Sequence, residues 1–232
     1  MRLPRPALVA VVVLAVLTAV HLAAQLTEAA TLADVTQWFL MPVLAVALWL
    51  AADGARGRLV RLTVLGLGLS WLGDTAPDLV PDDASFLTML GFFLVAHVAY
   101  VAAFWPLRAD GVLGRRPVLV VPYLVVLVAL VTVCAPGAGG LLAPVVVYGT
   151  VLTAVAVLAT FDGVAAVGGA LFIVSDSLIA LNAFVDGYAL PGHGFWVMLT
   201  YVAAQALLAA GVLRTVRGAP AAKADVGADA PA

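Results

Sequence analysis

The chain is a succession of long apolar runs separated by short polar turns. The runs from Ala7 to Ala24 and from Val118 to Val133 contain no Lys, Arg, Asp or Glu at all. A helix needs about 20 apolar residues to cross the hydrocarbon core of a bilayer. The pattern therefore predicts an all-α polytopic membrane protein, a bundle of eight transmembrane helices. The expected spans are about 6–25, 33–52, 59–78, 84–105, 117–134, 141–161, 164–185 and 194–213.

Composition supports this fold class. Hydrophobic residues make up 65% of the 232 positions and charged residues only 10%, whereas soluble domains are about half apolar and a quarter charged. The segments of roughly ten alternating residues typical of a membrane β-barrel are absent. Pro42 lies inside the second span and predicts a kink or a locally unwound turn. We expect one transmembrane domain over residues 1–217, followed by a disordered cytoplasmic tail at 218–232, which is rich in Ala, Pro, Gly and Asp.

The basic residues occur only in every second loop and at the two ends of the chain. With eight spans, all eleven fall on one side of the membrane: Arg2, Arg5, Arg56, Arg58, Arg61, Arg108, Arg115, Arg116, Arg214, Arg217 and Lys223. The opposite loops carry acidic residues and no base. Because cytoplasmic loops are enriched in Lys and Arg, this alternation predicts that both termini face the cytoplasm. We expect a multi-pass protein of the cell membrane.

Several polar side chains lie inside the expected spans, where burial costs a few kcal/mol or more for an ionisable group and usually turns it toward the bundle interior. They are Asp74, His97, Tyr100, Ser175, Asp176, Asn182, Tyr201 and Gln205. Their depths, at 1.5 Å per residue, allow most of them to share one layer if the third, fourth, seventh and eighth spans are neighbours. The segment ending at Asp74 (GLSWLGD) also resembles the one ending at Asp176 (ALFIVSD).

Each of these residues has a purely structural alternative. Asp74 can act as a helix-end cap, and His97 can be a neutral core histidine. The two tyrosines, Gln205 and Asn182 can hydrogen-bond between helices, and Ser175 can bond back to the preceding turn. With three scattered histidines and one cysteine, no metal cluster is evident in the sequence, and we expect no metal and no cofactor.

Two buried carboxyl groups can perform acid–base chemistry. A carboxylic acid in a low-dielectric site can stay protonated and act as a general acid. A second, ionised carboxylate can stabilise a developing cation or activate water, as in glycoside hydrolysis. The same pair can relay protons or bind a cation in a transporter, so this pattern by itself leaves enzyme and transporter open.

Five motifs carry a family resemblance. They are GLGLSWLGD (66–74), GFFLVAHVAYVAAF (91–104), PVVVY (144–148), GALFIVSDSL (169–178) with Asn182 and Phe184, and YVAAQ (201–205). In this order the chain resembles the YhhN-like lysoplasmalogenase family of integral membrane proteins, for which eight spans are expected. In the second span the chain has Met41 before Pro42, where relatives tend to carry Lys-Pro, which puts the head-group preference in doubt.

The resemblance implies hydrolysis of the vinyl ether bond of lysoplasmalogens, giving a fatty aldehyde and glycerophospho-ethanolamine or -choline. Asp74 and Asp176 would then divide the acid and base roles. His97 and Tyr100 would orient a water or a carboxylate, whereas Tyr201 and Gln205 would position the substrate. Ser175 and Asn182 are further candidates for substrate binding.

The expected partners are a lysophospholipid substrate and the membrane lipids. A basic patch with interleaved aromatic residues, as nucleic-acid binding requires, is not present. The competing interpretations are a metal-dependent membrane hydrolase of another lipid, a proton-coupled transporter and a structural protein. The oligomeric state is not encoded in any pattern that we recognise.

Overall fold

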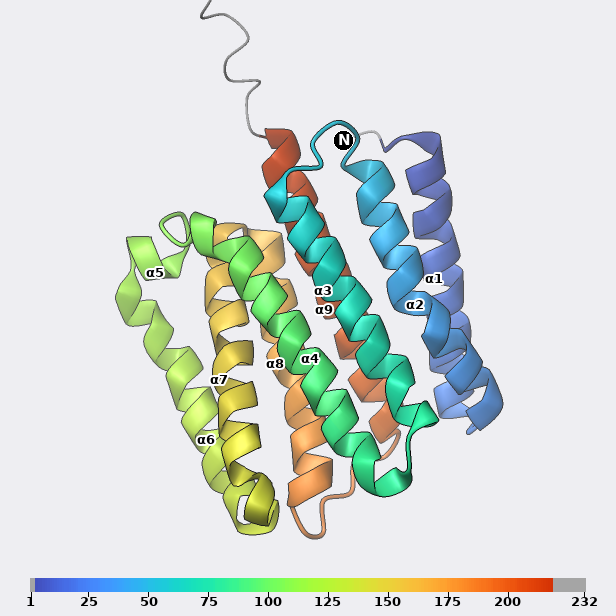
Figure 1. Cartoon of the computed structure of the whole chain (residues 1–232), viewed down its shortest axis with the longest axis vertical. Helices are drawn as coiled ribbons and strands as arrows, with labels where there is room; N and C mark the ends of the chain where they lie inside the picture. The colour runs from blue at the N-terminus through green and yellow to red at the C-terminus, as the bar shows by residue number, and fades with distance from the viewer. Residues whose placement is uncertain (1–2, 219–232) are drawn as a thin grey trace, which may run out of the picture.

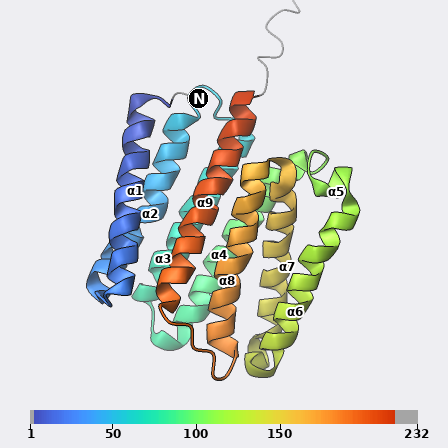
Figure 2. The same ribbon diagram turned by 180° about the vertical axis from the view of Figure 1, so that it is seen from behind.

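The fold is known from a computed structural model, which describes residues 3–218. Within this range the chain is helical and contains no strand. The long helices are α1 (Arg5–Leu26), α2 (Ala30–Ala51), α3 (Arg58–Thr75), α4 (Asp82–Phe104), α6 (Val121–Ala138), α7 (Leu142–Leu158), α8 (Gly163–Phe184) and α9 (His193–Gly218). They run alongside one another from one end of the molecule to the other (Figures 1 and 2).

Short helical segments join the long ones. They are η1 (Ala76–Leu79), η2 (Trp105–Leu107), α5 (Val112–Arg115), η3 (Pro117–Val120), η4 (Gly139–Leu141) and η5 (Ala159–Phe161). Helix α5, between the fourth and fifth expected spans, is an addition to the predicted pattern. The expectation of an unwound turn at Pro42 is wrong, because α2 continues through this residue. The tail predicted to be disordered lies outside the described residues from 219 onward, whereas Gly218 ends α9.

Six segments of the described chain are long and apolar enough to cross a membrane. One of them, Pro117–Phe161, contains both α6 and α7. Helix α3 is not among the six, and it carries three charged residues, Arg58, Arg61 and Asp74. The helices therefore fit a polytopic membrane protein.

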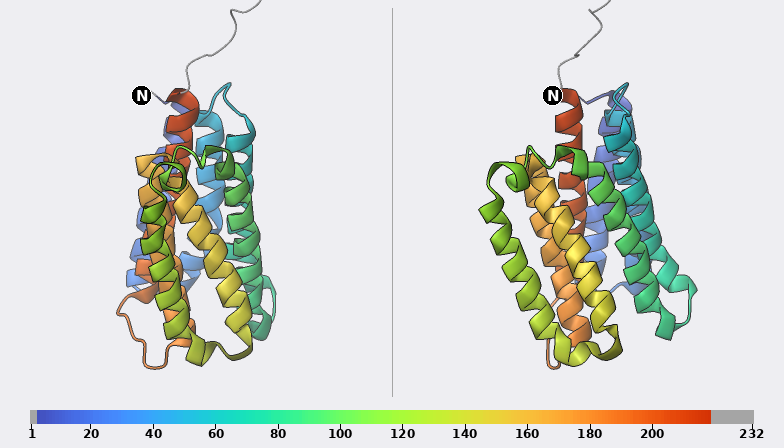
Figure 3. Two further views of the ribbon diagram at one scale, coloured as in Figure 1. Left: turned by 90° about the vertical axis from the view of Figure 1, so that its left-hand side faces the viewer. Right: turned by 60° about the vertical axis from the view of Figure 1, so that its left-hand side comes forward.

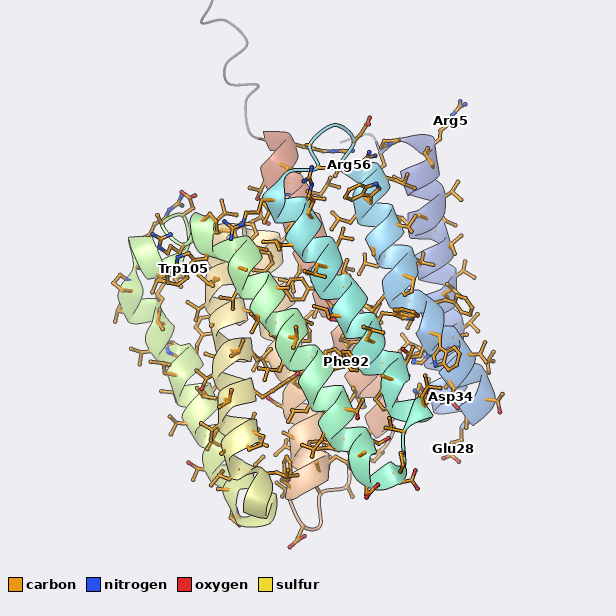
Figure 4. All side chains as sticks on the ribbon, in the orientation of Figure 1. Arg5, Glu28, Asp34, Arg56, Phe92 and Trp105 are labelled. Atoms are coloured by element: carbon orange, nitrogen blue, oxygen red, sulfur yellow. The ribbon has the colours of Figure 1, made fainter. Side chains whose placement is uncertain are left out.

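Charge is sorted between the two ends of the bundle. Figure 4 shows Arg5 and Arg56 at the end where the N-terminus lies, and Glu28 and Asp34 at the other end. We call these the arginine end and the acidic end. The start of α1 and the end of α9 both lie at the arginine end (Figures 1 and 3). Every arginine of residues 3–218 sits in a loop or terminal helix turn at this end.

The helices pack as a ring. Contacts run from α1 to α2, α3, α4, α7, α8 and α9 and back to α1, and α6 stands outside the ring against α7 and α8. Glycines permit close contacts in this ring: a Cβ on Gly73 would lie 2.6 Å from Cδ2 of Phe93, and one on Gly66 would lie 2.8 Å from Cε1 of Tyr100. Small residues at such positions let membrane helices approach closely, so α3 and α4 meet tightly beside the site described next.

Candidate active site

A cavity of about 360 Å³ lies within the bundle, and each of the eight long helices contributes to its wall. Asp74 on α3 and Asp176 on α8 both line it, together with Ser175 and Tyr201. Four of the residues predicted from the sequence thus meet at one cavity. The two similar segments that end in Asp74 and Asp176 supply two of the three carboxyl groups in its wall, and Asp78 supplies the third.

Each carboxyl group is paired with a tyrosine from another helix. Tyr201 on α9 donates a hydrogen bond to Oδ2 of Asp74 over 2.8 Å. Tyr148 on α7 donates one to Oδ2 of Asp176 over 2.5 Å. Hydrogen bonds to ionised groups are short and about twice as strong as neutral ones, and either oxygen of a carboxyl group can accept one. The cavity therefore contains two Tyr–Asp pairs.

The two pairs differ in their surroundings. Asp176 retains 9% of its surface exposed, whereas Asp74 belongs to the partly exposed residues. The side-chain amide of Gln37, on α2, also approaches Asp74 and lines the cavity. Ser175 instead donates to the carbonyl oxygen of Val197 over 3.1 Å, which ties α8 to α9. Asp176 is thus the more enclosed carboxyl group of the two.

Tyr100 and Gln205 form a separate polar layer and do not line the cavity. The Tyr100 hydroxyl donates to Oε1 of Gln205 over 2.6 Å, and Nε2 of Gln205 donates to Oγ of Ser70 over 3.0 Å. Ser70 precedes Asp74 by one helical turn, and Gln205 follows Tyr201 by one turn. Since Tyr100 and Gln205 are fully buried, this layer joins α3, α4 and α9 directly beneath the Tyr201–Asp74 pair.

His97 is fully buried behind the cavity wall. Its ring centroid lies 4.7 Å from that of Phe172 and 5.2 Å from that of Tyr148, with the Tyr148 ring edge-on. Neither ring nitrogen has a hydrogen-bond partner in the described part of the chain. His97 therefore touches the site through the ring of Tyr148 and contacts neither carboxyl group by a hydrogen bond.

Asn182 lies away from the cavity and is exposed. It follows Asp176 by six residues, which at 3.6 residues per turn turns it by about 120° from the face that carries the carboxyl group. It was a candidate for substrate binding from the sequence, but it is not part of the cavity wall. Depth does not determine the direction in which a helical side chain points.

Some cavity residues were not singled out from the sequence. Tyr148 appeared only within a family motif, and Gln25, Gln37 and His193 were not considered. A tyrosine within a span close in depth to Asp176 is a signal that could have identified Tyr148. Among residues 3–218, no group of three or more His, Cys, Asp or Glu side chains is placed to hold a metal ion.

Comparison with known proteins assigns the family. The model of the YhhN family matches residues 32–212. This chain belongs to the YhhN family. Two curated relatives, each 33% identical, are the Lysoplasmalogenase of Mycobacterium bovis, over 67% of this chain, and Lysoplasmalogenase TMEM86B of Rattus norvegicus, over 75%. The match spans 61% of the mycobacterial relative and 71% of the rat one. No solved structure matches the chain.

Proposed function

We propose that this chain is a membrane-embedded hydrolase that cleaves the vinyl ether bond of lysoplasmalogens. The products are a fatty aldehyde and glycerophospho-ethanolamine or -choline. One observation carries the proposal: Asp74 and Asp176 line a single cavity, and each accepts a hydrogen bond from a tyrosine of another helix. The names of the YhhN-family relatives, which are lysoplasmalogenases, support the same reaction.

Vinyl ether hydrolysis needs an acid and then a base. A proton is added to the β-carbon of the vinyl ether, and the α-carbon becomes an oxocarbenium ion. Water adds to that carbon and loses a proton, which gives a hemiacetal. The hemiacetal hydroxyl then loses its proton while the bond to the glycerol oxygen breaks. The glycerol oxygen takes up a proton, and the aldehyde is released. Two carboxyl groups that line one cavity can serve as the acid and the base of this scheme.

We assign proton donation to Asp176 and acceptance of the water proton to Asp74. An uncharged acid is easier to keep in apolar surroundings than a carboxylate, and Asp176 is the more enclosed of the two. The hydrogen bond from Tyr148 engages its Oδ2, which leaves Oδ1 to carry the proton. Tyr201 donates a hydrogen bond to Oδ2 of Asp74, and Gln37 lines the same cavity.

The proposal includes a topology of eight spans in the cell membrane with both termini in the cytoplasm. Two features support it. The two ends of the described chain lie at one end of the bundle (Figure 1), and the arginines gather at that same end. Since basic loops stay in the cytoplasm, the arginine end is the cytoplasmic one and the acidic end faces outward.

The test is aldehyde release from lysoplasmenylethanolamine by the purified protein in detergent, beside Asp74→Asn and Asp176→Asn. We expect each variant to lose about 10²- to 10⁴-fold in kcat, the usual worth of a positioned acid or base. Asp186→Asn, on the exposed loop between α8 and α9, is the matched control and should retain wild-type activity. Each preparation is also assayed with a chelator, to which a reaction run by the carboxyl groups should be insensitive.

Three results would contradict the proposal or a part of it. If folded Asp176→Asn protein kept full activity, Asp176 could not be the proton donor. Folded wild-type protein that releases no aldehyde would instead direct the search toward another lipid or toward transport. Aldehyde release that stops with chelator would favour the metal-dependent alternative.

A further inference from the structure

The cavity extends across the bundle and has chemically different walls on its two sides. Helices α6 and α7 lie on one side of the bundle and α1 and α2 on the other, in both opposite views (Figures 1 and 2). The wall from α6 and α7, which we call the chain arm, consists of Leu127, Leu130, Val131, Val145, Gly149 and Leu152. The polar arm on the opposite side consists of Gln25, Gln37, Asp78 and His193.

The two Tyr–Asp pairs lie between these arms. Their four residues come from α3, α7, α8 and α9, and α3, α8 and α9 stand between the two sides of the bundle (Figures 1 and 2). A ligand that crosses the cavity would therefore place a polar group on one side of the carboxyl groups and an apolar group on the other. A lipid with one chain has this arrangement, because its polar head group and its apolar chain lie on opposite sides of the ether bond that joins them.

The chain arm is apolar and narrow. It contains no polar side chain other than the neighbouring Tyr148, and a Cβ on Gly149 would lie only 2.9 Å from Cδ1 of Leu127. Known small-molecule pockets range from about 300 to 1,000 Å³, so a cavity of about 360 Å³ can enclose a head group and the first carbons of one chain. Gly149 lets Leu127 of α6 pack closely against α7, and because both residues line the cavity, a larger side chain at 149 would displace Leu127 or enter the cavity.

The polar arm offers neutral donors and a carboxylate but no cationic base. No Lys or Arg of residues 3–218 lines the cavity, and the described arginines lie at the arginine end. Gln25 and Gln37 each offer an amide, and His193 an imidazole, at the cavity wall. These groups suit the phosphate and alcohol oxygens of a lipid head group far better than its methylenes.

We propose that a single-chain lipid lies across the bundle, with its chain in the chain arm, its head group in the polar arm and its ether bond between the two carboxyl groups. Gly149 is the position on α7 at which a larger side chain would narrow the chain arm. This orientation rests on the proposed function for the reaction itself, but it concerns binding and can be tested without hydrolysis. The first carbons of the chain are enclosed, and the remainder continues toward the bilayer past α6.

The experiment uses two saturated 1-O-alkyl lysophosphocholines, which lack the vinyl bond. One carries a diazirine near the sixth carbon of the chain, and the other carries it on the head group. Each is photolysed with the full chain in lipid nanodiscs, and the labelled chymotryptic peptides are identified by mass spectrometry. We expect the chain probe to label α6 and α7 and the head-group probe to label α1, α2 or the start of α9. The reverse pattern, or equal labelling of both sides by both probes, would overturn the proposal.

A pair of variants tests the role of Gly149. In Gly149→Leu we expect labelling of α6 and α7 by the chain probe to fall at least tenfold. Gly91→Leu is the matched control, because a Cβ on Gly91 meets nothing within 4 Å, and it should label as the wild type does. If Gly149→Leu fails to fold, Leu127→Trp narrows the same arm from α6 and should have the same effect. Unchanged labelling in a folded variant would show that the chain lies elsewhere.

Hydrolysis measured on the same preparations separates the two proposals. Labelling in the expected pattern without aldehyde release would leave the orientation standing and contradict the proposed reaction. Aldehyde release with labelling in the reverse pattern would support the proposed reaction and contradict the proposed orientation.

Discussion

Tyr148 and Asp176 are joined by a hydrogen bond of 2.5 Å between neighbouring helices, α7 and α8. The second pair, Tyr201 and Asp74, connects residues 127 positions apart in the chain. One pair is thus local to the C-terminal half, whereas the other joins the two halves. Because each tyrosine fixes the direction of one carboxyl group, the tyrosines should matter to the rate as well as to packing.

Tyr148→Phe should lower kcat for aldehyde release by about 10- to 100-fold while KM changes little. The reason is the loss of one hydrogen bond to an ionisable group, worth about 1.5–3 kcal/mol, at 1.36 kcal/mol per tenfold in rate. Steady-state kinetics on the purified variant provide the measurement. Tyr123→Phe on α6, which makes no hydrogen bond to either aspartate, is the control. Wild-type kcat in folded Tyr148→Phe would show that the pair has no role in the rate.

The Tyr148–Asp176 pair should behave as one unit in a double-mutant cycle. Residues that act together show strongly non-additive effects on rate. Once Asp176→Asn has removed most of the activity, adding Tyr148→Phe should cost less than about threefold more. If the two losses simply multiply, the residues act independently.

Gln205→Leu should lower stability more than it affects substrate binding. The substitution leaves the hydroxyls of Tyr100 and Ser70 without their buried partner, at about 1–3 kcal/mol for each unsatisfied group. Thermal unfolding in detergent should show a lower midpoint, with KM nearly unchanged below it. A KM raised tenfold at unchanged stability would instead support the direct substrate contact predicted from the sequence.

Glycine substitutions in α3 should separate packed from open positions. Gly73→Ala places a methyl group against the ring of Phe93 and should destabilise by about 1–3 kcal/mol, as overpacked cores do. Gly68→Ala, on the same helix, meets nothing within 4 Å and should be neutral or slightly stabilising, because alanine favours helix more than glycine does. Equal stabilities of the two variants would contradict the tight α3–α4 contact.

The proposed topology predicts which positions react from outside the cell. In a Cys134→Ser background, cysteines at Glu28 or Asp186 should react with a membrane-impermeant maleimide on intact cells. Cysteines at Asp53 or Asp110, at the arginine end, should react only after lysis. Labelling of Asp53→Cys but not of Glu28→Cys on intact cells would show that the orientation is the reverse of the one proposed. Labelling of cysteines at both ends on intact cells would contradict the proposed eight spans.

Much of the architecture could be predicted from hydropathy. Long apolar runs have few alternatives to helix in a bilayer, since every backbone polar group must be satisfied within the segment. The gathering of Asp74, Asp176 and Tyr201 followed from their depth and from the cost of burying charge. The acidic and arginine ends followed from the alternation of charged loops.

The contacts between helices could not be predicted in the same way. The sequence does not show that Tyr201 contacts Asp74 or that Tyr148 contacts Asp176. Which helices become neighbours depends on packing between segments that are far apart in the chain. The sequence also does not show how each helix is rotated about its axis, so Asn182 was a candidate for substrate binding although it is exposed and does not line the cavity. Pro42 was expected to cause a kink or a locally unwound turn, and α2 continues as a helix through it.

The cavity wall draws on every long helix from α1 to α9, and this has a consequence for biosynthesis. Tyr201 lies on α9, which leaves the ribosome after α3, so Asp74 has no tyrosine partner until α9 has been made. A chain interrupted before α9 would carry both aspartates but no complete site. The proposed site should therefore form only after α9 has been inserted.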